Sequence, residues 1–199
     1  MAATERDEQA RNEFKTNQAT LETDQLVVLD ECGTHTSLTP THGWSKRGQR
    51  ATGTAPRNRG KNVTLIAALT TSNALAAQTC MVIEGATDRA VFEAYIEKVL
   101  CPHLRNGQTV IMDNLSAHKS LKVKQLIEAK GCKILFLPVY SPDLSPIELA
   151  FSKFKAYLRR IGAREREALE NAIGQCAELI TSQDALGYFK HCGYPSLVQ

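Results

Sequence analysis

The segment from Leu135 to Glu148 constrains the fold of this chain more than any other stretch of its 199 residues. An apolar run ending at Leu137 has strand character, a proline-studded turn follows, and a helix is expected to begin at Ser145. Pro146 suits the first helical position, because the N–H that it lacks would have no intrahelical partner there. Glu148 therefore falls in the first helical turn, just beyond the end of a strand. In open α/β sheets, this is where ligands bind.

Two further acids end apolar runs upstream, Asp30 after residues 26–29 and Asp113 after residues 110–112. An unpaired charge at the end of a buried strand is unfavourable, and two neighbouring carboxylates repel each other unless a cation intervenes. Magnesium prefers oxygen ligands and is commonly held by one or two carboxylates. Each Asp alone could instead cap a turn. Taken together, Asp30, Asp113 and Glu148 predict a divalent-metal site, in which two ions would suit phosphodiester chemistry.

The order of expected elements predicts an α/β fold. Strands are expected over residues 26–29, 62–70, 76–84, 109–112 and 133–137, with helices after Thr87, around 123–127, from Ser145 and around 169–180. The first three strands favour an antiparallel meander, whereas strands separated by helices favour parallel pairing. A mixed five-stranded sheet flanked by helices satisfies both and is similar to the ribonuclease H fold. Thr181-x-x-Asp184 and Ser145-x-x-Glu148 both have the pattern of a helix capping box.

Composition indicates one soluble domain. Residues 1–24 are mostly polar, with Phe14 the only aromatic side chain, and are expected to be a weakly helical lead-in or linker before a domain over 25–199. No signal-peptide core or apolar run of about 20 residues is present, so we expect a cytoplasmic protein without a membrane partner. Six cysteines without a CxxC pair suit reduced thiols: Cys32, Cys80, Cys101, Cys132, Cys176 and Cys192.

Basic residues are concentrated in two places. No acid occurs between Glu31 and Glu84, and the segment between them holds Lys46, Arg47, Arg50, Arg57, Arg59 and Lys61. On the helix that begins at Ser145, Lys155 and Arg159 share a face with Glu148. Both groups are either solvated surface or contacts for a DNA backbone, since clustered cations release counterions on binding nucleic acid. Trp44 could stack on an unpaired base or simply pack.

These motifs resemble the catalytic domain of DDE transposases, from the bacterial insertion-sequence branch of the mariner superfamily. The resemblance rests on four stretches and on the 34 residues between Asp113 and Glu148: Asp30-Glu31-x-Gly33, Gly43-Trp44-x-x-x-Gly48-Gln49-Arg50, Asp113-Asn114-x-x-x-His118 and Leu137–Glu148. It covers nearly all of residues 26–194. It implies a ribonuclease H-like catalytic domain in which Asp30, Asp113 and Glu148 are the catalytic triad and hold two Mg²⁺ or Mn²⁺ ions.

The resemblance also implies auxiliary residues and partners. Asn114, His118 and Ser145 lie in the matching motifs; Ser145 replaces the usual Asn, and His118 could orient DNA or a ligand carboxylate or be a structural turn residue. Asp143 and Glu31 are not members of the triad. Relatives carry helix-turn-helix domains upstream, which about 25 residues cannot hold. We therefore expect double-stranded DNA, a second copy of the chain on that DNA, and a separately encoded DNA-recognition polypeptide as partners.

Three functions are compatible with these patterns. The first is a transposase catalytic domain, acting at the bacterial nucleoid, that hydrolyses DNA phosphodiesters and joins the resulting 3′-hydroxyl to target DNA. The second is a DNA-binding remnant or regulator that does not cut; the missing recognition domain favours it, whereas the intact triad favours the enzyme. The third, a cellular ribonuclease H-type nuclease, fits the fold but not the Ser141-Pro142-Asp143 motif.

Overall fold

The computed structural model describes residues 4–196, without the side chains of residues 176 and 177. Within this part of the chain, a mixed sheet has the strand order β3-β2-β1-β5-β6, with β4 also paired to β2. The strands are β1 (Leu26–Thr34), β2 (Val63–Thr70), β3 (Ala74–Leu75), β4 (Met81–Glu84), β5 (Thr109–Met112) and β6 (Lys133–Phe136). The sheet therefore has six strands and not five: β3 lies just before the strand expected over residues 76–84, and the first part of that stretch forms the short helix η2 (Ala77–Thr79), which leaves only β4 as a strand.

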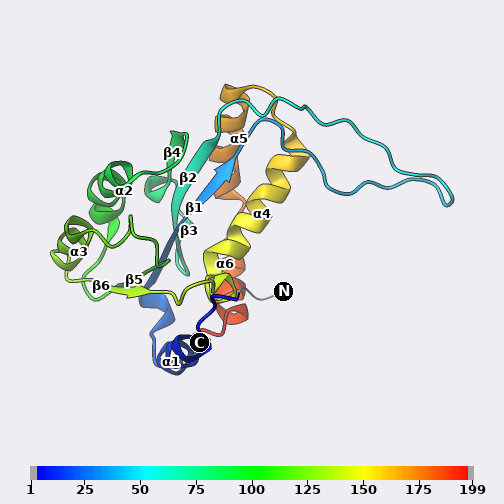
Figure 1. Ribbon diagram of the computed structural model, residues 1–199. Helices are drawn as coiled ribbons and strands as arrows, with labels where there is room; N and C mark the ends of the chain where they lie inside the picture. The colour runs from blue at the N-terminus through cyan, green and yellow to red at the C-terminus, as the bar shows by residue number, and fades with distance from the viewer. Residues whose placement is uncertain (1–3, 197–199) are drawn as a thin grey trace.

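Helices cover both faces of the sheet (Figure 1). They are α1 (Glu8–Gln18), α2 (Arg89–Tyr95), α3 (Leu121–Glu128), α4 (Pro146–Ile161), α5 (Arg166–Glu178) and α6 (Ser182–His191), with short helices η1 (Thr23–Gln25), η3 (Ile96–Leu100, a π-helix), η4 (Cys101–His103) and η5 (Pro142–Leu144). Helix α2 begins after Asp88, whose side chain accepts from the Val91 N–H. The expected cap, Thr87, lies one residue earlier.

The two faces of β1 belong to two separate apolar cores. Val28 packs with α4, α5 and α6, whereas Leu29 packs with α2, η3 and α3. Successive strand residues point to opposite faces, so a central strand must be apolar on both. Each fully buried large apolar side chain contributes about 1.5–3 kcal/mol to folding. Burial on both sides therefore fixes β1 in the middle of the sheet, where Asp30 of this strand lines the functional site.

The N-terminal segment is a packed helix. Sequence analysis predicts a weakly helical linker here, but α1 begins after Asp7, whose side chain accepts from the Ala10 N–H, and it buries Arg11, Phe14 and Gln18. Phe14 joins the core formed with α4 and α6. The helix was missed because two of its three buried residues are polar, so its sequence lacks an apolar stripe.

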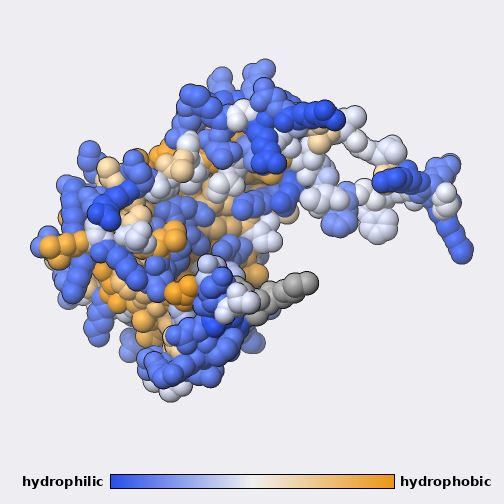
Figure 2. Space-filling view, viewed as in Figure 1, coloured by the Kyte–Doolittle hydropathy of each residue, from blue (hydrophilic) through white to orange (hydrophobic). Residues whose placement is uncertain are grey.

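Residues 35–62 form an irregular arm that projects from the domain between β1 and β2 (Figure 1). Every residue from Pro40 to Asn62 is exposed, Trp44 completely so. Trp44 therefore has no packing role within the described chain. The base of the arm is fixed by Arg164, whose guanidinium donates to the carbonyl oxygens of Thr36 and Leu38, both at 2.9 Å. Hydrophilic residues predominate along the arm (Figure 2).

None of the helices in the described chain is both long and apolar enough to cross a membrane. The cysteines at positions 32, 80, 101, 132 and 192 are free thiols, and all but Cys80 are buried. The side chain of Cys176 lies outside the described residues.

The two expected capping boxes have different outcomes. At the start of α6, the Thr181 hydroxyl accepts from the Asp184 N–H, and the Asp184 carboxylate accepts from the Thr181 N–H. At the start of α4, Ser145 occupies the cap position, but its side chain makes no capping bond. One four-residue pattern therefore forms a capping box in one place and fails to form it in the other.

This difference predicts unequal effects of removing the two hydroxyls. Thr181→Ala should lower the free energy of unfolding by about 1 kcal/mol, because it removes a capping bond. Ser145→Ala should lower it by less, since the serine hydroxyl satisfies no helical N–H. Urea denaturation of both variants checks this. Equal losses of stability would mean that Ser145 caps α4 in solution.

Candidate active site

The pairing of β1 with β5 brings the two aspartates to one edge of the sheet. The strands run parallel, with Val28 opposite Ile111, so Asp30 and Asp113 each lie two residues beyond this pair. Both therefore share the face of Val28 and Ile111, which is the face covered by α4. The parallel register thus places two carboxylates side by side, Asp113 just beyond the end of β5 and Asp30 within β1, which continues to Thr34 instead of ending before Asp30 as expected.

Glu148 approaches the same place from the first turn of α4. It is exposed, and its backbone N–H donates to the Ser145 carbonyl at 3.2 Å. The alternative role for Glu148, capping the helix together with the Ser145 hydroxyl, is absent from the structure. Ser145 Oγ is instead buried and finds no hydrogen-bond partner among the described residues. The Glu148 carboxylate is therefore available to a ligand.

The three carboxylates line one open cavity of about 370 Å³. Its wall is formed by residues from the middle of β1, from the segments after β5 and β6 and from the start of α4: Asp30, Glu31, Asp113, Asn114, Leu115, Leu137, Pro138, Val139, Tyr140, Ser141, Pro142, Ser145 and Glu148. The structure thus brings together the proposed triad and two of the three auxiliary residues, Asn114 and Ser145. The third, His118, lies behind the cavity.

Electrostatics at this edge favour a bound cation. Burial raises the pKa of Asp30 to about 7, against a hydrogen bond from the Glu31 N–H, and the negative charges of Glu148 and Asp113 raise it further. A divalent ion would relieve this repulsion, and the unpartnered Ser145 hydroxyl adds an oxygen at the same wall. In the described residues, no three His, Cys, Asp or Glu side chains are close enough to hold an ion as they stand. The donor set fits a hard cation in type, while the carboxylates are spread more widely than a closed site requires.

His118 is buried between two acids on the far side of this wall. Its Nε2 lies 3.1 Å from Glu31 Oε1, and its Nδ1 lies 2.5 Å from Asp113 Oδ1, an ion pair by distance without the direction of a hydrogen bond. Its ring stacks on Phe92 with centroids 4.1 Å apart. Burial lowers the pKa of His118, but the contacts with Asp113 and Glu31 outweigh this and raise it to about 9. The imidazolium is therefore stable at neutral pH and fixes Asp113 from behind.

Glu31 and Tyr140 are site residues for which sequence analysis assigned no role. Glu31 follows Asp30 and so points to the opposite face of β1, where His118 lies; strand alternation is the signal that could have found it. Tyr140 is exposed and has a φ of 53°, a left-handed conformation that is uncommon for residues other than glycine. Leu115 and Val139 are also exposed at this rim. The mouth of the cavity thus combines an apolar edge with an acidic floor.

The basic residues expected to bind DNA form two groups. Lys46, Arg47, Arg50 and Arg57 are exposed on the arm. Lys61 pairs with Glu84, so the positive charge of Lys61 is partly neutralised. Glu84 also pairs with Arg166. Burial lowers the pKa of His35, and the charges of Arg59 and Arg159 lower it further. The arm base is therefore near the part of α4 that holds Arg159.

Lys155 of the α4 group is half-buried and contacts the Cys32 thiol. Burial raises the pKa of this thiol to about 11, against the nearby positive charge of Lys155. Arg159 is also half-buried and lies toward the arm base, so only part of the predicted stripe is fully open to solvent.

The raised pKa of Asp30 predicts a pH-dependent gain from Asp30→Asn. The folded-state pKa, about 7, exceeds the ordinary 3.8, so wild-type stability is lost as pH rises through this interval. The variant should match wild type near pH 4 and be more stable at pH 8 by roughly 2 kcal/mol, discounted for partial exposure. Urea denaturation across pH without metal measures this, with exposed Asp24→Asn as the control. A pH-independent difference would contradict the burial of the Asp30 charge.

Comparisons with known proteins bear on the fold and the family of this chain. No curated protein matches the chain. Among solved structures, the Mos1 transposase paired-end complex with left transposon end has a TM-score of 0.70 at 18% identity, covering 96% of this chain and 60% of that chain. The mariner Mos1 paired end complex with Mg has a TM-score of 0.66 at 19% identity, with the same coverage. The Mos1 transposase catalytic domain with Raltegravir and Mg has a TM-score of 0.60 at 15% identity, covering 94% and 89%.

At these identities, the likeness shows the fold and confirms the predicted ribonuclease H-like architecture. The chain spans about 60% of the length of the transposase chains in the paired-end complexes. The DDE superfamily endonuclease family matches residues 25–170, which is more than half of the chain and includes Asp30, Asp113 and Glu148. The chain therefore belongs to the DDE superfamily endonucleases.

Proposed function

We propose that this chain is a transposase catalytic domain that hydrolyses DNA phosphodiesters and transfers the resulting strand, using divalent metal. The observation that carries the proposal is the meeting of Asp30, Asp113 and Glu148 in one open cavity, where β5 ends beside the middle of β1. Membership of the endonuclease family supports it. The similar Mos1 structures include complexes with transposon ends, with Mg and with Mn. Assignment to the bacterial insertion-sequence branch, with action at the nucleoid, stays a prediction.

In this proposal Asp30, Asp113 and Glu148 hold two Mg²⁺ or Mn²⁺ ions. When bound, the ions would activate the attacking oxygen and stabilise the leaving one. The protein contributes position: Asp30 is fixed by the bond from the Glu31 N–H at 2.7 Å, and Asp113 by His118 and the Leu115 N–H, both at Oδ1. His118 thus acts as a positioning residue, and the apolar rim limits water around the reacting phosphate.

The arm and the nearby end of α4 are proposed to contact the DNA backbone. Six cations lie on an arm whose described residues from Pro40 to Asn62 are all exposed, and Arg59 and Arg159 are both near enough to His35, at its base, to lower the pKa of that imidazole. Such contacts position a duplex but carry no base information. A second copy of the chain would bind the same DNA, and a separately encoded helix-turn-helix polypeptide would supply end recognition. A DNA-binding regulator that does not cut remains the alternative function.

Glu148→Gln tests the catalytic assignment. Glutamine is a much poorer ligand for magnesium, so the variant should fold normally, lose most of the thermal stabilisation given by Mg²⁺ or Mn²⁺, and cleave DNA orders of magnitude more slowly. Thermal unfolding with and without metal and a Mn²⁺-supplemented cleavage and strand-transfer assay on element ends measure both effects.

Glu178→Gln, at the exposed end of α5 away from the cavity, is the matched control and should behave as wild type. Near wild-type cleavage by Glu148→Gln would remove Glu148 from the triad. Metal-dependent stabilisation without any cleavage by wild type, even with added recognition polypeptide, would favour the regulator.

The arm predicts a salt dependence of DNA binding. Lys46, Arg47 and Arg50, changed together to Gln, should flatten the slope of log affinity against log salt by about 0.9 for each phosphate that the arm no longer neutralises. The control removes three exposed charges elsewhere, from Lys124, Lys130 and Lys133 around α3. Fluorescence anisotropy on random duplex DNA at several salt concentrations gives both slopes. If the arm variant and the control have equal slopes, the arm is a solvated loop.

A further inference from the structure

Arg11 is the largest fully buried side chain of the described residues, with 1% exposure. Its guanidinium binds Asp143 at both carboxylate oxygens: Nη1 donates to Oδ1 at 3.0 Å and Nη2 donates to Oδ2 at 2.6 Å. The two residues are 132 positions apart in the sequence. Paired contacts of this kind fix orientation as well as distance. Helix α1 is therefore tied to the short helix η5, which directly precedes α4.

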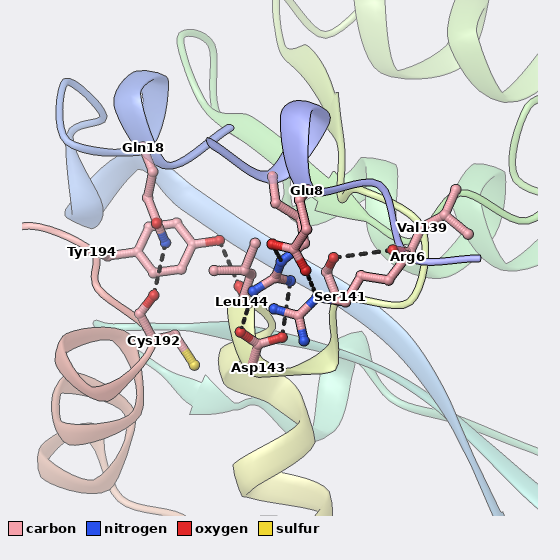
Figure 3. Close-up of polar contacts among 10 residues, drawn as sticks. Arg6, Glu8, Gln18, Val139, Ser141, Asp143, Leu144, Cys192 and Tyr194 are labelled. Carbon is pink, nitrogen blue, oxygen red and sulfur yellow. Dashed lines mark hydrogen bonds and ion pairs between the residues drawn. The ribbon is translucent and has the colours of Figure 1, made fainter. Parts of the chain in front are cut away.

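A second contact reaches η5 from the other end of the chain. The Tyr194 hydroxyl donates to the Leu144 carbonyl at 3.0 Å, and its ring packs edge-on against Phe189 of α6. Figure 3 shows Tyr194 reaching Leu144 of this short helix, next to Asp143. The two ends are also tied to each other, because Gln18 Nε2 donates to the Cys192 carbonyl at 3.0 Å. Side chains from both ends of the described chain thus hold one three-residue helix.

This support matters because α4 lacks a capping bond of its own. The Ser145 side chain does not bond to the first turn, so the direction in which α4 leaves η5 depends on how η5 itself is held. Within η5, the Leu144 N–H donates to Ser141 and the Ser145 N–H to Pro142, both at 3.0 Å, which makes it a compact unit. Glu148 lies one helical turn beyond this unit. A tilt of η5 would therefore move the Glu148 carboxylate relative to Asp30 and Asp113.

We propose that Arg11 and Tyr194 are positioning residues for Glu148: they fix η5 so that α4 delivers its carboxylate to the cavity floor. The inference rests on the proposed function, in which Glu148 holds metal. Neither residue lies in the stretch matched by the endonuclease family, residues 25–170. The helix α1 and the segment after α6 then belong to the working catalytic unit, although neither contributes a side chain to the cavity wall.

Two variants separate positioning from general stability. Arg11→Met keeps an unbranched, apolar stem and removes the guanidinium with its charge, leaving Asp143, which is half-exposed, to be solvated. Tyr194→Phe keeps the ring against Phe189 and removes only the hydroxyl, so it should fold even if Arg11→Met does not. The matched controls lie on α4 itself: Lys153→Met breaks the 2.8 Å ion pair to Asp184, and Tyr157→Phe breaks the 3.1 Å bond to Gln175.

The measurement is Mn²⁺ binding to the full chain without DNA, followed by electron paramagnetic resonance well below the unfolding temperature. Both variants should weaken Mn²⁺ binding roughly 10-fold, the usual scale for residues that orient a metal ligand, whereas the controls should bind as wild type. Arg11→Lys, which keeps the charge but not the fork, should give an intermediate value. Metal-free affinity for DNA should be unchanged in all variants. At saturating Mn²⁺ the cleavage rate should recover.

The outcomes distinguish the two levels of inference. If Glu148→Gln abolishes Mn²⁺ binding while Arg11→Met and Tyr194→Phe bind as the controls do, the positioning role is wrong and the proposed function stands. If Glu148→Gln binds Mn²⁺ like wild type, the metal assignment fails and the positioning role fails with it. In the combination of Glu148→Gln with Tyr194→Phe, the inference requires no additional loss of binding, because both changes act on the same carboxylate.

Discussion

Repulsion among carboxylates at one sheet edge is the constraint on which this structure depends. Asp30 is partly buried, with Asp113 and Glu148 close enough to raise its pKa, so the fold must hold like charges together against their mutual repulsion. The apolar cores on both sides of β1 supply the opposing free energy. The arrangement is typical of functional sites, where stability is given up for a preorganised group of ligands.

A different set of contacts fixes the position of each carboxylate. The parallel register of β1 and β5 sets Asp30 beside Asp113, and His118 holds Asp113 from the opposite side of the strand with Glu31 as its second partner. The position of the Glu148 carboxylate is fixed less directly, through the short helix η5 that precedes α4. The sequence left His118 open between a ligand-orienting and a structural role. In the structure His118 is buried between Asp113 and Glu31 and stacks on Phe92, which is compatible with both roles at once.

The parts of the fold that were predictable depend on local patterns. Apolar runs that end in an acid mark β1 and β5, and the proline turn before Pro146 marks the start of α4, so the three carboxylates could be assigned from short stretches. What was missed depends on distant contacts. Arg11 resembles an exposed helix residue until Asp143, 132 positions away, is brought to it.

Local patterns were also insufficient to place helix caps, because similar short sequences can form a cap in one place and not in another. Asp88 and Thr87 are adjacent and both suit a helix cap, so sequence alone could not choose between them. The capping-box pattern occurs at Thr181 and at Ser145 but forms only at Thr181, since tertiary surroundings decide where each side chain points. Trp44 looked like a packing residue because its segment gave no sign of projecting from the domain.

The contacts between the two chain ends have a consequence for the order of assembly during synthesis. Polypeptides emerge from the ribosome N-terminus first, so α1 emerges before the other described elements. Its partner Asp143 follows Arg11 by 132 positions, and the carbonyl of Cys192 follows Gln18 by 174 positions. Strands β1 and β5 can pair well before that. A growing chain can therefore align its two aspartates while the support for α4 is still unmade. The segment after α6 therefore completes the support for α4 only after all the strands of the sheet have been made.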